Sequence, residues 1–302
     1  MKQIDRITTG DHPIRSRRWF LGRRPFLQLV IGLPLAMIAA SVAGITQVLF
    51  AFAQGAADWD EALVKVWPGQ PIGMALQIAA AIAVMWFVIA KIAGRPVFEL
   101  SRQGAFKEGM IGAAIGTGIV TVTVGVLATF GGYIMTDVTL GRGILTGLLL
   151  GLGAAFGEEV AIRGILLRLL DARFGPVAAV TLTSLAFGAL HLANPHATLL
   201  GALGFAMQAG VLFGLAYLLT RRLWFAIGMH AAINFTQAAI FGLPVSGTTV
   251  EPGLLVGELR GPAWLSGGAT GIEGSVIMLI VAATVSALLS ATVWARERTK
   301  RL

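Results

Sequence analysis

The sequence predicts an all-α membrane protein, a polytopic transmembrane helical bundle of about eight spans. Of its 302 residues, 56% are hydrophobic and only 13% are charged, and the mean hydropathy is +0.80. Soluble domains carry about 25% charged residues. The apolar runs are long and continuous, whereas an outer-membrane barrel shows alternating segments of about ten residues. Cysteine is absent, which excludes disulfides, thiol catalysis and cysteine metal sites.

Each expected span is an apolar run of membrane-crossing length, bounded by charged, Gly or Pro residues. The eight runs lie at about 26–52, 72–92, 109–135, 143–170, 177–193, 198–220, 223–241 and 272–294. Residues 98–107, before the third span, are amphipathic, and we expect them on the inner membrane surface. Small residues four apart allow helices to approach closely. Such glycine pairs are Gly112 and Gly116, Gly147 and Gly151, and Gly210 and Gly214.

The order of spans divides the chain into six parts. They are a basic cytoplasmic tail at 1–26, N-terminal transmembrane helices at 27–135, a core at 143–240, an extracytoplasmic loop at 242–271, the last transmembrane helix at 272–294 and a basic cytoplasmic tail at 295–302. Eight spans place both termini on one side. The positive-inside rule assigns that side to the cytoplasm, because the tails and several short turns are basic and the loop around residues 58–61 is acidic.

The net charge of +8 is concentrated in the two tails. Basic clusters beside membrane segments bind anionic lipid, which is the partner expected for these tails. We expect no nucleic-acid partner, because no folded basic domain accompanies the clusters. The short loops and basic tails favour an integral protein of a bacterial plasma membrane.

The most unusual stretch is Glu158-Glu159-x-x-x-Arg163, inside the apolar run from 144 to 170. A charged side chain at mid-bilayer costs about 2.5–3.5 kcal/mol on insertion scales. Glu159 and Arg163 are four residues apart, on one helical face and in the order that favours an ion pair. Glu158 points about 100° away on an ideal helix and is available for chemistry.

Two later apolar helices carry histidines. Phe187 and His191 are four residues apart in the fifth span, and so are His230 and Asn234 in the seventh. Peptide hydrolysis needs a base that activates water, a donor for the leaving amine and a donor for the oxyanion. Glu158 with one histidine can fill the first two roles. The other histidine and Asn234 can fill the third.

The three motifs, Glu-Glu-x-x-x-Arg, Phe-x-x-x-His and His-x-x-x-Asn, each on its own helix, resemble those of the CPBP intramembrane protease family. This family holds the type II CAAX prenyl endopeptidases and the bacteriocin-processing and immunity relatives of the Abi group. The resemblance covers about residues 143–240 and implies a membrane endopeptidase in which Glu158 activates water. The implied assisting residues are His191, His230 and Asn234, and the implied supporting residues are Glu159, Arg163 and Phe187.

Alternatives remain open at this point. Glu158, His191 and His230 could supply three zinc ligands, with water as the fourth. No His-Glu-x-x-His pair is present, however, and we favour a metal-independent glutamate mechanism without a cofactor. A non-catalytic binding or immunity protein of the same fold would need none of these residues. A proton-coupled transporter would need ionisable groups along a path through the bilayer, whereas here they cluster in three helices.

The expected substrate is a membrane-associated protein or peptide. A prenylated CAAX sequence is one candidate, and other peptide precursors are equally open. Helix counting at about 1.5 Å per residue leaves one conflict. It places Glu158 nearer the inner end of its span and His191 nearer the outer end of the next. Irregular or shortened helices around the site would resolve this conflict.

Overall fold

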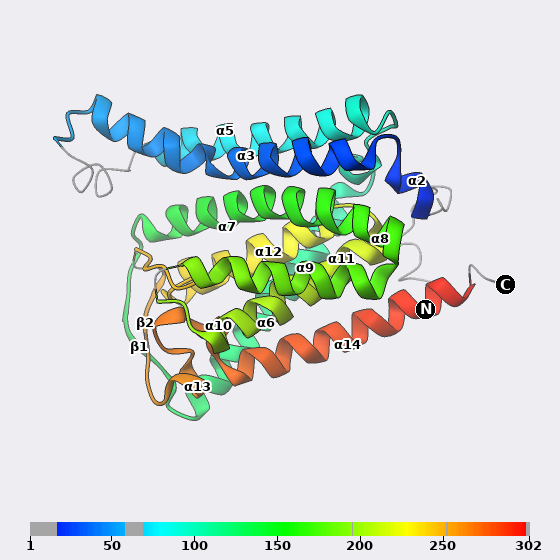
Figure 1. The fold of residues 1–302 in the computed structure, drawn as a ribbon. Coiled ribbons are helices and arrows are strands. Elements are labelled where there is room, and N and C mark those ends of the chain that lie inside the picture. Colours follow the sequence, from blue (N-terminus) through cyan, green and yellow to red (C-terminus); the bar gives the residue numbers. More distant parts are fainter. Residues whose placement is uncertain (1–16, 58–68, 195, 252, 300–302) are drawn as a thin grey trace.

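The computed structural model describes residues 17–57, 69–194, 196–251 and 253–299. The predicted basic tail up to residue 16, the acidic loop at 58–61 and the last three residues lie outside these ranges. The described chain forms a bundle of helices that run side by side, with a small sheet at one end (Figure 1).

The helices before the first motif and through it are α2 Arg17–Leu21, α3 Pro25–Ala53, α5 Gly69–Trp86, η1 Phe87–Ile92, η2 Phe98–Leu100, α6 Ala105–Thr129, α7 Gly143–Glu159, η3 Val160–Leu167 and α8 Arg168–Phe174. Those that follow are α9 Pro176–Leu190, η4 His191–Ala193, α10 Leu199–Phe205, η5 Ala206–Leu212, α11 Phe213–Thr220, α12 Trp224–Phe235, η6 Thr236–Ile240, α13 Ala263–Ser266, η7 Gly268–Thr270, η8 Ile272–Gly274 and α14 Val276–Thr299. The strands are β1 Tyr133–Val138 and β2 Leu255–Leu259.

Seven helices in the described ranges are long and apolar enough to cross a membrane, which confirms a polytopic helical membrane protein. They cover Pro25–Ala53, Gly69–Ile92, Ala105–Thr129, Gly143–Phe174, Pro176–Ala193, Leu199–Thr220 and Val276–Ala295. The predicted seventh span is α12 with its continuation η6, of 12 and 5 residues. At 1.5 Å per residue this helix is about 26 Å long. It runs beside the others in the bundle but is not among the seven spans (Figure 1).

Residues 98–107 begin with the short turn η2, where Glu99 is fully buried and pairs with Arg95, and then continue through exposed residues into the first turn of α6. The predicted end of the third span was wrong, because this helix ends at Thr129 instead of 135. Gly131 adopts a left-handed conformation with a φ of 69°, which breaks the helix. The chain then forms β1, which pairs antiparallel with β2 from the loop at 242–271.

Glycines let α12 lie in close contact with both α6 and α7, as predicted. On α6, a Cβ atom at Gly112 would lie 2.2 Å from the carbonyl oxygen of Phe225. On α7, a Cβ atom at Gly151 would lie 2.6 Å from the carbonyl oxygen of Ala231. Only glycine allows the helix backbones to approach so closely. These contacts fix the position of α12, the helix that carries His230.

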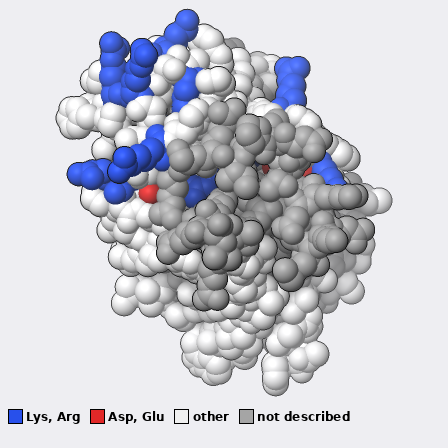
Figure 2. Space-filling model, turned by 90° about the vertical axis from the view of Figure 1, so that its right-hand side faces the viewer, with Lys and Arg blue, Asp and Glu red and all other residues white. Residues whose placement is uncertain are grey.

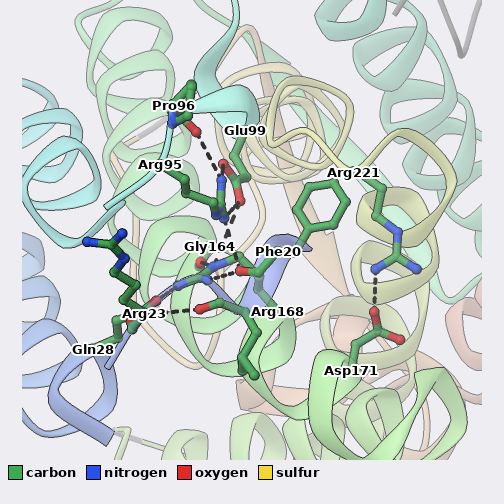
Figure 3. A network of polar contacts seen from close by, with 11 residues as sticks. Phe20, Arg23, Gln28, Arg95, Pro96, Glu99, Gly164, Arg168, Asp171 and Arg221 are labelled. Carbon is green, nitrogen blue, oxygen red and sulfur yellow. Dashed lines mark hydrogen bonds and ion pairs between the residues drawn. The ribbon is translucent and has the colours of Figure 1, made fainter. Parts of the chain in front are cut away.

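A buried network of charges joins the short helix α2 to the first residue of α8 (Figure 3). Arg95 donates to both carboxylate oxygens of Glu99, and Nε of Arg168 lies 3.8 Å from the same carboxylate. Both guanidinium groups also donate to the carbonyl oxygen of Phe20. Arg168 further donates to the side-chain oxygen of Gln28 on α3. The network therefore anchors the N-terminal segment to the helix that carries the first motif.

The two ends of the bundle differ in charge. Figure 2 shows Lys and Arg side chains on the end where α2 and α8 lie. The exposed basic residues of the helix ends and turns that meet there are Arg18, Arg23, Arg24, Lys91, Arg102, Lys107 and Arg173. The opposite end, which holds the sheet, mixes exposed Asp137, Glu251 and Glu258 with Arg142 and Arg260.

Candidate active site

Glu158 and Glu159 are the last two residues of α7, and the π-helical stretch η3 follows them directly. The side chain of Glu159 is fully buried, whereas that of Glu158 is 34% exposed. Short π-helical segments widen the helix, alter the register of side chains and occur frequently at functional sites. The two adjacent carboxylates therefore face different surroundings.

The carboxylate of Glu159 joins two helices. Its Oε1 accepts a hydrogen bond of 2.9 Å from Arg163, which is the expected ion pair. The same oxygen lies 2.9 Å from Nδ1 of His230 on α12. Arg163 is itself fully buried, donates to the carbonyl oxygen of Ala209 and lies 5.2 Å from the ring centroid of Phe187. The contact with His230 is a role of Glu159 that the spacing of the motifs did not reveal.

This contact fixes the orientation and tautomer of His230. A carboxylate can only accept, so Nδ1 of His230 carries the hydrogen and Nε2 keeps its lone pair. The ring stacks on Phe213 with centroids 4.9 Å apart. Nε2 lies 4.0 Å from Oε2 of Glu158, a buried oxygen without a hydrogen-bond partner in the described chain. That separation is too long for a direct hydrogen bond and suits a shared water molecule.

His191 is held just as firmly at the end of α9. Its Nδ1 donates to the carbonyl oxygen of Phe187 at 2.8 Å, because a carbonyl oxygen can only accept. The imidazole lies between the rings of Phe187 and Phe205, with a centroid distance of 4.4 Å to each. Phe187 thus supports His191 and Arg163 together. Nε2 of His191 is the nitrogen left for other partners.

One cavity of about 1190 Å³ brings the four predicted catalytic residues together. Glu158, His191, His230 and Asn234 all contribute to its wall. Much of the remaining wall is apolar and comes from α3, α7, η3 and α9. These apolar residues include Leu33, Met37, Leu150, Ile162, Leu166 and Leu190. The cavity therefore combines a small polar group with a large apolar surface, which is typical of ligand sites.

Helix geometry resolves the predicted conflict of depth. The span that holds Glu158 extends from Gly143 to Phe174, so this residue lies near its middle. The regular part of α9 ends at Leu190, and a short 3-10 turn then carries His191 into the cavity. Both residues consequently reach the same space from helices of unequal length.

Six polar residues of the cavity wall lie outside the motifs. They are Ser41, Asn194, Gln208, Ser246, Thr248 and Glu273. Glu273 belongs to the predicted span 272–294, where a carboxylate is costly, and this position was the one signal in the sequence that marked it. The backbone of Ser246 and the amides could not be identified from sequence, because their roles depend on loop geometry.

The donor geometry bears on metal binding. Within the described residues, no three His, Asp or Glu side chains gather closely enough to hold a metal ion. Of the zinc ligands considered above, His230 uses Nδ1 for Glu159 and directs Nε2 toward Glu158.

The segment that carries the three motifs is similar to a known protein family. The family model for type II CAAX prenyl endopeptidase Rce1-like proteins matches residues 139–236. The match begins just before α7 and ends just after Asn234, so it includes all three motifs. Comparisons with curated proteins and with solved structures gave no match.

Proposed function

We propose that the chain is an intramembrane endopeptidase that uses Glu158 to activate water, in line with the match of residues 139–236 to the family model for Rce1-like type II CAAX prenyl endopeptidases. The observation that carries this proposal is the convergence of Glu158, His191, His230 and Asn234 on one cavity. Three separate helices supply these side chains. A purely structural ion pair would not require them to meet.

In the proposed reaction, a water molecule donates hydrogen bonds to Oε2 of Glu158 and to Nε2 of His230, which lie 4.0 Å apart. Glu158 removes a proton from the water, and the hydroxide adds to the carbonyl carbon of the substrate. The side-chain amide of Asn234 donates to the oxyanion. The C–N bond then breaks, and the proton held by Glu158 passes to the leaving amine. His191, when protonated at Nε2, adds a second donor.

We propose that the reaction needs no metal ion. Glu158 and His230 suffice to polarise the water, and Glu159 keeps His230 in the required tautomer. The lack of three converging ligands among the described residues supports this choice. The substrate is proposed to be a membrane-associated protein or peptide. The apolar wall of the cavity suits an apolar segment or an attached prenyl chain.

We propose that the basic end of the bundle faces the cytoplasm of a bacterial plasma membrane, where it contacts anionic lipid. The charge difference between the two ends supports this orientation. The described end of α14 lies at the same end of the bundle as α2, in agreement with two cytoplasmic termini (Figure 1).

The test is cleavage by the purified protein in lipid nanodiscs. The substrates are a farnesylated CAAX peptide, its unprenylated form and a transmembrane peptide. We expect wild type to cleave at least one of them and Glu158→Gln to lose about 10²–10⁴-fold in kcat. Glu258→Gln, which changes an exposed carboxylate on β2, serves as the matched control. Cleavage by Glu158→Gln at the wild-type rate contradicts the mechanism, and a wild type that cleaves none of the three favours the binding protein.

A further inference from the structure

Glu273 is a buried carboxylate that the proposed reaction does not use. It lies on η8, just before α14, and outside the segment that matches the protease family. Its residue is only 4% exposed, yet it lines the same cavity as Glu158. A buried carboxylate at the wall of a proposed active site needs a physical reason.

Both carboxylate oxygens of Glu273 meet hydrogen-bond donors. Oε1 accepts from the backbone N–H of Ser246 at 2.9 Å, and Oε2 accepts from Nε2 of Gln237 at 2.6 Å. An ionised carboxylate is an acceptor at both oxygens and matches this pair of donors. An amide at the same position would place its own N–H₂ group against one of them.

The two donors connect Glu273 to the helices that carry the two histidine motifs. Gln237 lies three residues after Asn234, on the continuation of α12, and also donates to the carbonyl oxygen of Pro244. The carbonyl oxygen of Ser246 accepts from Nδ2 of Asn194 at 2.9 Å. Asn194 directly follows the 3-10 turn that begins with His191. The turn at 244–246 is thus tied to both α12 and the end of α9.

The turn adopts a conformation that needs such support. Ser246 has a φ of 53°, in the left-handed region that non-glycine residues rarely occupy. Residues in this region persist where the surroundings hold them. Glu273 also lies very close to the backbone of Gly271, because a Cβ atom added at Gly271 would lie 2.6 Å from Oε2 of Glu273. Glycine at 271, with a φ of 99°, permits both the turn and this contact.

We propose that Glu273 is a positioning residue of the active site, an inference that rests on the proposed function. Its carboxylate holds the 244–246 turn between the two histidine-bearing helices. Through Asn194 it sets the place of His191, and through Gln237 it sets the place of Asn234. Glu273 itself touches neither the substrate nor the reacting water.

The ionisation of Glu273 gives the proposal a distinctive signature. Burial raises the pKa of Glu273 to about 7, and the hydrogen bonds from Gln237 and Ser246 oppose this rise. From η5, Gln208 contributes an uncharged amide, which donates to the carbonyl oxygen of Glu273. The other ionisable groups of the cavity wall are Glu158 on α7, His191 on η4 and His230 on α12. Within the described residues, no Lys or Arg forms an ion pair with Glu273.

The kinetic test compares Glu273→Gln with wild type on a peptide that wild type cleaves. We expect kcat to fall about 10- to 100-fold, the cost of misplaced catalytic groups, while KM changes little. We expect wild type to show an ionisation near pH 7 in kcat, and we expect this ionisation to be absent from the profile of Glu273→Gln. Asn194→Ala removes the hydrogen bond from Asn194 to Ser246 on the other side of the turn. If both substitutions act through the turn, the fold loss of kcat in the double variant should be much smaller than the product of the two single losses.

A second measurement does not depend on cleavage. The chain has no cysteine, so a single engineered cysteine can be labelled without background. Ser246→Cys keeps the backbone contacts of the turn, and we expect its labelling by a water-soluble maleimide to be faster in the Glu273→Gln background. Ser101→Cys, at the other end of the bundle, reports general loosening and should label at the same rate in both backgrounds. Glu258→Gln is the matched control for loss of a carboxylate.

The outcomes separate this proposal from the proposed function. Loss of cleavage in Glu158→Gln together with a wild-type pH profile, kcat and labelling rate in Glu273→Gln overturns the positioning role alone. Faster labelling at position 246 supports the tie between Glu273 and the turn even where no peptide is cleaved. Equal acceleration at positions 101 and 246 shows a general structural role and overturns the proposal.

Discussion

Nδ1 of His230 and Oε1 of Glu159 lie 2.9 Å apart, and Arg163 donates to the same oxygen at 2.9 Å. One carboxylate therefore orients an imidazole on a different helix while it neutralises a buried guanidinium. The neighbouring carboxylate, that of Glu158, is left facing the cavity. Adjacent residues of one helix thus have separate tasks.

Removing either partner of the buried pair should destabilise the protein strongly, and the two losses should not add. Arg163→Met leaves the charge of Glu159 buried with His230 alone, and we expect the free energy of unfolding to fall by about 3–5 kcal/mol. Glu159→Gln should also destabilise, because it leaves the Arg163 charge uncompensated. The double variant should lose clearly less than the sum, as measured by unfolding in mixed detergent micelles. Strict additivity would show that the two side chains are not energetically coupled.

Close contact between α6 and α12 predicts a sharp contrast between two glycines of α6. Gly112→Ala places a methyl group 2.2 Å from a backbone oxygen of α12, so the helices must separate. We expect a lower melting temperature and weaker cleavage, because His230 moves with α12. Gly118→Ala is the matched control, since nothing lies within 4 Å of its added methyl group. Alanine there should be neutral or stabilise by up to about 1 kcal/mol. Similar melting temperatures for the two variants would argue against the close helix contact.

Chelation should leave the proposed reaction unchanged. After dialysis against EDTA, we expect wild-type cleavage to continue at its original rate, because water activation is assigned to Glu158 and His230. Elemental analysis of the dialysed protein accompanies the assay. Loss of cleavage with loss of one equivalent of zinc, restored by added zinc, would establish the metal mechanism instead.

Stability should decrease as the pH rises through the range in which Glu273 titrates. The ordinary pKa of a glutamate is 4.5, and burial raises that of Glu273 to about 7. Between these values the folded protein retains a proton that the unfolded chain has lost, so the free energy of unfolding falls with rising pH, by roughly 3 kcal/mol. Glu273→Gln should show a smaller decrease. Thermal unfolding in detergent from pH 4 to pH 8 measures both, and identical slopes would remove Glu273 as the cause.

Most of the architecture could be predicted because a membrane imposes simple requirements. Apolar runs of the necessary length have few alternatives to helix, and the observed spans follow the predicted ones closely. The strand β1 escaped prediction because its apolar residues continue the run of α6. Its identity depends on Gly131 and on a partner strand that lies more than a hundred residues later.

The candidate site could also be predicted only in part. Residues at helical spacing, such as Glu159 with Arg163 and His230 with Asn234, could be grouped from sequence because each pair shares a helix. The bond between Glu159 and His230 could not, since it depends on how α7 and α12 pack. The role of Glu273 was harder still to predict. Its partners include loop residues, and no sequence periodicity relates them to Glu273.

The anchoring of α2 has a consequence for biosynthesis. The carbonyl oxygen of Phe20 is held by Arg168, which follows it by 148 residues in the chain. Synthesis proceeds from the N-terminus, so α3 and α5 emerge from the ribosome long before this guanidinium exists. Arg95 can hold the amino-terminal segment earlier, but the network around the carbonyl oxygen of Phe20 is complete only when about half of the protein has been made. Completion of this network reports that the helix bearing Glu158 has been inserted and has reached its place.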